Sequence, residues 1–189
     1  MDEPVEREIK LRFDTAADAR EAVRGLGASL HRGRRFQEDC LFDTDDERLR
    51  MERSALRIRN EGQRSLLTFK GPVQPGPMKV REELETVVAD GEMLRQVLER
   101  LGLHVWFRYQ KYREEFAWTD VVIAVDETPV GTFVEIEGGE AGIDATARAL
   151  GRSRGDYILD SYHRLFLTNR EALGFKGSNM VFDDPGRES

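Results

Sequence analysis

The chain has 189 residues, of which 39% are hydrophobic, so it is long enough to form one domain with its own core. Charged residues make up 34%, above the usual quarter, and the net charge of -7 argues against a broad surface for nucleic acid or anionic membranes. Cys40 is the single cysteine, which excludes an intrachain disulfide and is typical of a reducing compartment. No apolar run approaches the length of a membrane span, and the first residues lack the features of a signal peptide. We therefore expect a cytoplasmic protein that binds neither nucleic acid nor a membrane.

The first patterned stretch is residues 5–13, where apolar and charged side chains alternate almost strictly. A period of two predicts a β-strand, because successive side chains of a strand point to opposite faces. One face therefore carries two carboxylates and two cations, which are Glu6, Glu8, Lys10 and Arg12.

The next elements follow from apolar periodicity and from turn residues, including the Asn60-Glu61-Gly62-Gln63 turn of a hairpin. We expect a helix from Asp14 or Thr15 to about Leu26, followed by an irregular basic segment at 28–35 and a strand at 35–42. The stretch at 47–53 is ambiguous and is either one helical turn or the start of a strand. We then expect hairpin strands at 55–60 and 64–70, a proline-containing loop at 71–77 and a strand at 79–88.

The second half of the chain predicts three strands between helices. In chain order we expect a helix at 90–101 capped by Asp90, strands at 108–118, 120–127 and 132–137, and helices at 140–150 and 161–173. Residues 176–189 are rich in Gly, Ser, Asn, Asp and Pro, which predicts a disordered tail. We therefore expect one domain over residues 1–175.

Most of these roughly eight strands repeat the pattern of the first, with charges of both signs on one face and apolar residues on the other. The cations on such faces are Lys10, Arg12, Arg57, Arg59, Lys70, Lys79, Arg81, Lys111 and Arg113. The anions are Glu6, Glu8, Glu83, Glu85, Glu115, Asp126, Glu135 and Glu137. The pattern allows two interpretations: solvent-exposed faces of an ordinary sheet, or the lumen of a closed barrel whose apolar outer face is covered by helices.

A charged lumen indicates a charged ligand, because buried charges are costly unless they find partners. Lysine and arginine match phosphate oxygens, whereas carboxylates close to a phosphate need a bridging hard cation. The i, i+2 pairs Glu6 with Glu8 and Glu135 with Glu137 suit such a role. This interpretation predicts a polyphosphate bound together with Mg²⁺ or Mn²⁺.

An ordered series of motifs also resembles a known family. The series is Glu6-x-Glu8-x-Lys10, Leu56-Arg57-Ile58-Arg59, Leu67-Thr68-Phe69-Lys70-Gly71-Pro72, Lys79-Val80-Arg81-Glu82-Glu83-Leu84-Glu85, Lys111-Tyr112-Arg113, Asp126, Glu135-Ile136-Glu137 and Ser161-Tyr162. Together, over about residues 4 to 170, it resembles the CYTH superfamily of triphosphate tunnel metalloenzymes. That superfamily includes class IV adenylyl cyclases, thiamine triphosphatases and tripolyphosphatases.

The resemblance implies an α+β fold: an eight-stranded antiparallel β-barrel, or tunnel, with helices packed outside. It implies phosphate binding by Lys10, Arg57, Arg59, Lys70, Arg81, Lys111 and Arg113. It implies that Mg²⁺ or Mn²⁺ is held by Glu6, Glu8, Glu135 and Glu137 with help from Asp126. It assigns catalysis to Lys10, Glu6, Glu8 and Asp126.

Three functions are compatible with such a tunnel: hydrolysis of a triphosphate, cyclisation of ATP to cyclic AMP and pyrophosphate, and polyphosphate binding without turnover. We favour hydrolysis of tripolyphosphate, thiamine triphosphate or a nucleoside triphosphate, because it needs no nucleoside pocket and none can be located from the sequence. The intact glutamate pairs disfavour a binding module. Trp106 and Trp118 are expected to pack under helices, and a homodimer is compatible with the family.

Overall fold

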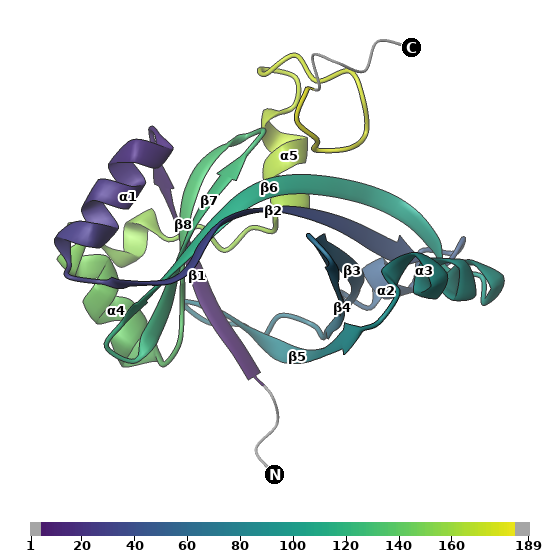
Figure 1. The fold of residues 1–189 in the computed structure, drawn as a ribbon, viewed down its shortest axis with the longest axis horizontal. Coiled ribbons are helices and arrows are strands. Elements are labelled where there is room, and N and C mark those ends of the chain that lie inside the picture. Colours follow the sequence, from purple (N-terminus) through teal and green to yellow (C-terminus); the bar gives the residue numbers. More distant parts are fainter. Residues whose placement is uncertain (1–4, 184–189) are drawn as a thin grey trace.

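In the computed structural model, which describes residues 5–183, the strands form one closed antiparallel barrel (Figure 1). The strands are β1 (Val5–Phe13), β2 (Ser29–Asp43), β3 (Ala55–Glu61), β4 (Arg64–Lys70), β5 (Lys79–Val88), β6 (His104–Trp118), β7 (Val121–Thr128) and β8 (Gly131–Glu137). Their order around the barrel is β1-β5-β4-β3-β2-β6-β7-β8, with β8 pairing back onto β1. The predicted eight-stranded barrel is therefore confirmed.

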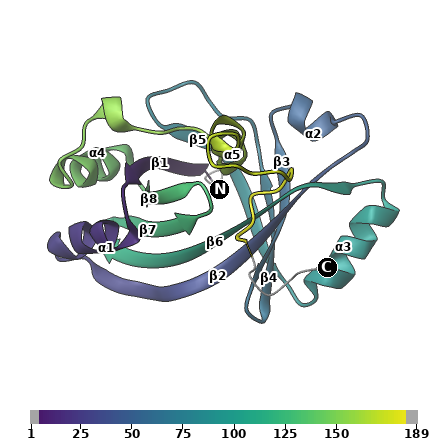
Figure 2. The same cartoon turned by 90° about the horizontal axis from the view of Figure 1, so that it is seen from above.

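Helices cover parts of the outer surface (Figures 1 and 2). They are α1 (Ala16–Gly25), α2 (Arg48–Met51), α3 (Gly91–Arg100), α4 (Glu140–Ala149) and α5 (Tyr162–Asn169), with a short 3₁₀ turn at Arg154–Asp156. Thr15, Asp90 and Ser161 begin α1, α3 and α5, and each side chain accepts a hydrogen bond from a backbone N–H of the first turn.

The main apolar core lies between the barrel wall and the pair α1 and α4. Ile9, Ile123 and Ile136 point outward from β1, β7 and β8 and pack against Val23 of α1 and Ile143 of α4. The alternate residues of the same strands point inward, as the period of two requires. Apolar burial on the outside thereby fixes which side chains face the lumen.

The largest difference from the sequence prediction is at β2, which begins at Ser29 although residues 28–35 are predicted to be irregular. β6 likewise begins at His104, four residues before its predicted start at 108. These two 15-residue strands pair with each other through several register irregularities, including two between Leu30 and Arg35. Because such bulges interrupt the alternation of side chains, the sequence pattern fails there.

The predicted tail also differs in part from the structure. Met180 forms a parallel bridge with Tyr109, and its backbone exchanges hydrogen bonds with Arg108 and Gln110. Its side chain is fully buried against Phe107 and Phe166. Residues near Met180 are therefore held along β6 by sheet-like hydrogen bonds, while 184–189 lie outside the described residues.

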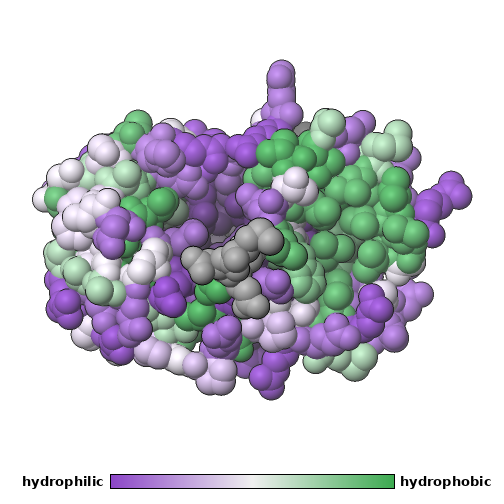
Figure 3. All heavy atoms as spheres, turned by 90° about the horizontal axis from the view of Figure 1, so that it is seen from below, coloured by the Kyte–Doolittle hydropathy of each residue, from purple (hydrophilic) through white to green (hydrophobic). Residues whose placement is uncertain are grey.

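The outer surface is uneven in its polarity. In Figure 3, hydrophilic residues surround a recess, whereas hydrophobic surface spreads over the side formed by α3 and β5. Leu84 of β5 and Met93, Val97 and Leu101 in and beside α3 are exposed there. Within the described part of the chain, none of the helices combines the length and apolar character needed to span a membrane.

Replacing Met180 by alanine should lower the free energy of unfolding by about 2–5 kcal/mol, because it opens a cavity beneath the C-terminal segment. Urea denaturation measures this change. Leu173→Ala is the matched control, since Leu173 is 52% exposed and its truncation should change stability by less than about 0.5 kcal/mol. Equal denaturation midpoints for wild type and Met180→Ala would show that the C-terminal segment adds no stability.

Candidate functional site

The barrel encloses a cavity of about 760 Å³, within the range of small-molecule binding sites. Its lining contains thirteen lysines and arginines and nine aspartates and glutamates, although the whole chain is acidic. All seven predicted phosphate-binding cations line it: Lys10, Arg57, Arg59, Lys70, Arg81, Lys111 and Arg113. Of the predicted acidic ligands, Glu6, Glu8, Glu135 and Glu137 line it as well. The charged faces of separate strands therefore converge, while their roles toward phosphate and metal remain predictions.

On one wall, the register of β1 with β5 and β8 sets glutamates opposite cations. Glu8 lies opposite Lys79 on β5, and Lys10 lies opposite Glu135 on β8. The Lys79 Nζ is 2.6 Å from a Glu8 Oε1 that also accepts from the Lys10 Nζ at 3.0 Å, and Lys10 is 3.2 Å from Glu135. These carboxylates are thus already bound by cations of the chain.

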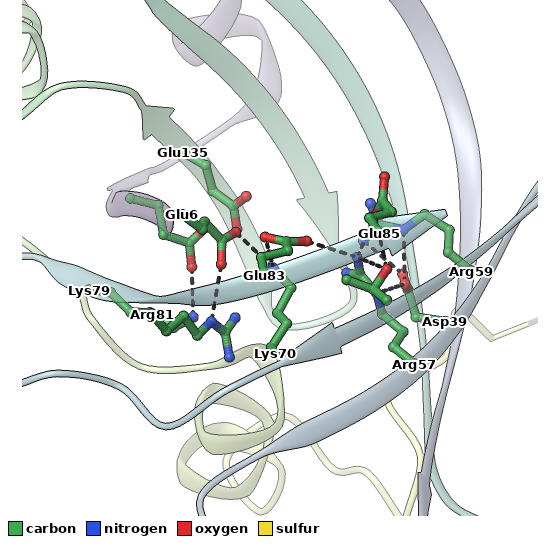
Figure 4. Close-up of polar contacts among 12 residues, drawn as sticks. Glu6, Asp39, Arg57, Arg59, Lys70, Lys79, Arg81, Glu83, Glu85 and Glu135 are labelled. Atoms are coloured by element: carbon green, nitrogen blue, oxygen red, sulfur yellow. Dashed lines mark hydrogen bonds and ion pairs between the residues drawn. The ribbon is translucent and has the colours of Figure 1, made fainter. Parts of the chain in front are cut away.

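A second group continues this wall toward β4, as Figure 4 shows. Lys70 Nζ lies 2.7 Å from Glu6 and 2.9 Å from Glu83, and Arg81 Nε lies 3.0 Å from the other Glu6 oxygen. Attraction to Lys70 and Arg81 outweighs burial and repulsion from Glu8, so the pKa of Glu6 lies below its ordinary value. Glu6 is therefore ionised at neutral pH.

Asp39 of β2, which is not among the predicted site residues, organises the arginines of β3. The side chain is fully buried and lies 2.9 Å from Arg59 Nε and 3.3 Å from Arg57 Nε (Figure 4). Arg57 also donates to Thr68 at 3.0 Å. Burial raises the cost of the Asp39 charge, but the two arginines outweigh it and hold its pKa below the ordinary value. Alternation along residues 35–41, with Asp39 on the charged face, is the signal that points to it.

Asp126 occupies a different position from the other predicted metal ligands. It is fully buried, does not line the cavity, and accepts from Lys111 at 2.8 Å, Arg113 Nε at 2.7 Å and the Tyr162 hydroxyl at 2.7 Å. Both of its oxygens are therefore occupied. Its predicted metal-binding and catalytic roles remain predictions, and these contacts support a role in orienting Lys111 and Arg113.

Three cations gather around Tyr162, the first residue of α5. Lys10 and Lys111 lie 5.3 and 4.9 Å from the centre of its ring, and Arg113 pairs with both Asp126 and Glu135. Burial and then the charge of Arg113 lower the pKa of Lys111 to about 8, while Glu135 and Glu8 overcome burial and raise the pKa of Lys10. The site thus concentrates positive charge that a bound anion would stabilise.

The carboxylates at the end of β8 have the chemistry of ligands for a divalent cation. Glu137 lies opposite Glu8 in the register, and among residues 5–183 no ion pair or hydrogen bond reaches its carboxylate. Glu137 keeps solvent access at the end of β8, but partial desolvation by its neighbours and repulsion from Glu6, Glu8 and Glu83 raise its pKa to about 7. Neighbouring carboxylates that repel one another are oxygen donors of the kind that Mg²⁺ and Mn²⁺ bind, so the residues fit such an ion.

The same carboxylates are not arranged as a ready-made coordination shell. Over residues 5–183, no set of three or more Asp, Glu, His or Cys side chains is positioned to hold a metal. Glu6 and Glu8 face Lys70, Arg81, Lys79 and Lys10 instead. Metal binding therefore requires these cations to exchange partners.

A further polar group at the start of β2 was hidden by the irregular segment predicted there. Arg35 lies 2.7 Å from Glu61 and 2.7 Å from Glu115, and Gln37 donates to Glu61. Arg32 also pairs with Glu61. All five residues line the cavity: β2 supplies Arg32, Arg35 and Gln37, β3 supplies Glu61 and β6 supplies Glu115.

Comparison with known proteins gives the family. The CYTH domain model matches residues 5–162, which includes every strand of the barrel. The chain belongs to the CYTH domain family. A Methanocaldococcus jannaschii protein named "putative adenylate cyclase" is 34% identical over 134 residues, covering 70% of this chain and 76% of that protein.

Solved structures of similar length share the fold. The PH1012 protein of Pyrococcus horikoshii OT3 superposes with a TM-score of 0.72 at 27% identity, covering 85% of this chain and 98% of that one. A Hippeastrum protein, described as a "putative adenylyl cyclase" with a dominant triphosphatase activity, superposes with a TM-score of 0.66 at 18% identity, covering 87% and 95%. The second likeness concerns the fold alone.

Replacing Glu137 by glutamine should stabilise the metal-free protein at pH 8 and leave it unchanged at pH 4. Because the folded-state pKa of about 7 exceeds the ordinary 4.5, the folded state binds more protons than the unfolded state between these values. Wild-type stability therefore falls as the pH rises from 4.5 to 7, and glutamine removes that loss. Thermal unfolding in EDTA across this range provides the measurement; parallel curves for both proteins would contradict the prediction.

Proposed function

We propose that this CYTH protein is a divalent-metal-dependent enzyme that hydrolyses a phosphoanhydride bond of a triphosphate bound in its lumen. The observation that carries the proposal is the convergence of seven predicted phosphate-binding cations and four glutamates on one cavity. A triphosphate carries several negative charges along a short chain, and cations from many strands can contact its phosphates along the tunnel.

The chain's own residues account for much of the chemistry. Phosphoryl transfer needs little besides positioning and stabilisation of the charge that develops on the phosphoryl oxygens. Lys10, Lys111 and Arg113 gather around Tyr162 and Glu135, so they would hold such a phosphoryl group. Asp126 fixes Lys111 and Arg113 from behind, which keeps both cations in place before the substrate arrives.

The proposed metal is Mg²⁺ or Mn²⁺, held by Glu6, Glu8, Glu135 and Glu137. When bound, it would neutralise charge on the phosphate oxygens and orient them. Glu137 is the residue most available for it, because it lacks an ion pair among residues 5–183. If a phosphate bound Lys70 and Arg81, the Glu6 carboxylate that these two cations now hold would become available to the metal.

The second candidate is a class IV adenylyl cyclase, which the name of the 34% identical archaeal relative supports. In that reaction the ribose 3′-hydroxyl attacks the α-phosphorus of ATP and pyrophosphate leaves. The same cations could hold the triphosphate, so the two reactions differ in which phosphorus is attacked.

A substrate panel tests the proposal. Purified protein is incubated with ATP, thiamine triphosphate or tripolyphosphate, with Mg²⁺, Mn²⁺ or EDTA, and phosphate, pyrophosphate and cyclic AMP are quantified. We expect metal-dependent release of phosphate. Cyclic AMP with pyrophosphate would instead establish the cyclase, and binding without any product would establish a polyphosphate-binding module.

Arg59→Ala should lower kcat/KM for the hydrolysed substrate by about ten- to a hundredfold, the effect of losing a charge-assisted hydrogen bond. Arg64→Ala is the matched control, because Arg64 is exposed at the start of β4 and does not line the cavity. Steady-state kinetics of both variants measure the effect. Equal kinetics for Arg59→Ala and wild type would remove Arg59 from the phosphate site.

A further inference from the structure

One end of the lumen differs in chemistry from the rest. Leu41, close to the end of β2, and Trp106, close to the start of β6, line it beside Leu159 and His163, which flank the start of α5. Leu41 and Trp106 pack against the same apolar cluster. We call Leu41, Trp106, Leu159 and His163 the aromatic mouth.

The aromatic mouth lies away from the Glu137 carboxylate, which has no ion pair among residues 5–183. β6 and β8 both pair antiparallel with β7, so they run in the same direction. Trp106 is the third residue of β6, whereas Glu137 is the last residue of β8. The mouth and Glu137 therefore lie toward opposite ends of the barrel, with Lys111 and Arg113 of β6 between them.

The indole ring of Trp106 is held in place by its neighbours. The Arg50 guanidinium lies 4.4 Å from the ring centre, and Arg50 is fixed by Asp43 at 3.0 Å. The imidazole of His163 meets the indole edge-on at a centroid distance of 4.7 Å. Burial lowers the pKa of His163, so this ring is neutral at physiological pH. Arg50 covers part of the indole, but the remaining aromatic surface of Trp106 and the neutral ring of His163 suit a flat organic group better than they suit a phosphate.

We infer that Trp106 is a specificity-determining residue that stacks with the aromatic heterocycle of an organic triphosphate, while the triphosphate extends into the lumen. This inference rests on the proposed binding of triphosphate, and it narrows the substrate class to triphosphate esters of heterocyclic compounds. Arg53 and Arg164 also line the cavity, so a longer inorganic polyphosphate is the competing occupant.

The test compares ATP with inorganic tripolyphosphate in wild type, Trp106→Leu and Trp106→Phe. Trp106→Leu should lower kcat/KM for ATP by about ten- to a hundredfold, the range of a lost base–aromatic stack, and leave tripolyphosphate unchanged. Trp106→Phe should restore most of the ATP activity. The matched control is Trp118→Leu, because Trp118 ends β6 and packs in the outer core without lining the cavity. Its substrate preference should equal that of wild type.

A binding measurement separates this inference from the proposed function. Trp118→Phe leaves Trp106 as the single tryptophan, so its fluorescence reports the mouth without any change at position 106. In EDTA, ATP should quench this emission, whereas tripolyphosphate and tetrapolyphosphate should leave it nearly unchanged. Absence of turnover with either substrate, accompanied by quenching with ATP, would overturn the proposed function and keep the inference.

Three outcomes would overturn the inference. The first is an equal loss for ATP and tripolyphosphate in Trp106→Leu. The second is an unchanged kcat/KM for both substrates in that variant. The third is quenching by tetrapolyphosphate as strong as that by ATP, which would assign the mouth to additional phosphates.

Discussion

The constraint on which the barrel depends is that charges enclosed in a lumen must be paired. Desolvation disfavours every ionised group there and an opposite charge at hydrogen-bond distance offsets it, whereas Glu137, which has no such partner among residues 5–183, has a raised pKa instead. Glu8 between Lys10 and Lys79, Asp39 between Arg57 and Arg59, and Asp126 between Lys111 and Arg113 each meet this requirement. Each anion lies between two cations. The strand register that pairs these charges therefore also brings the lumen cations together.

The protein thus holds its cations in place before any ligand is bound. Arg57 and Arg59 are oriented by Asp39, and Lys111 and Arg113 by Asp126, which Tyr162 in turn contacts from α5. A phosphate entering the lumen would find donors whose rotamers are already selected, which would lower the ordering cost of binding. Asp39 and Asp126 would act through the arginines and lysines they hold and without touching the substrate.

Most of the barrel could be predicted from the sequence because alternate side chains of each strand point to the outer apolar core and to the charged lumen. Strands β1 and β5 match their predicted bounds, and every predicted phosphate-binding cation reaches the lumen. The start of β2 was missed because its bulges break the alternation; Arg32 and Arg35 of the predicted basic segment line the lumen. Asp39 follows the alternation, but nothing local distinguishes it from a solvent-exposed aspartate.

The mouth could not be predicted from local pattern for a different reason. Trp106 was expected beneath a helix, and its neighbours Arg50 and His163 come from α2 and α5, which are distant in sequence. Similarly, Met180 lies in a polar segment whose composition indicates disorder, yet it fills a space between β6 and α5. Both features depend on tertiary contacts that periodicity does not encode.

Because the lumen is already filled with ion pairs, binding of a polyanion would exchange existing partners for new ones. A polyanion entering the lumen would take over lysines and arginines that Glu6, Glu8 and Glu135 now hold, and a metal would take over the displaced carboxylates. Dissolved ions weaken the internal ion pairs as well as the pairs between the protein and the polyanion. The affinity for the polyanion should therefore depend less steeply on ionic strength than it would in an open cleft of unpaired cations.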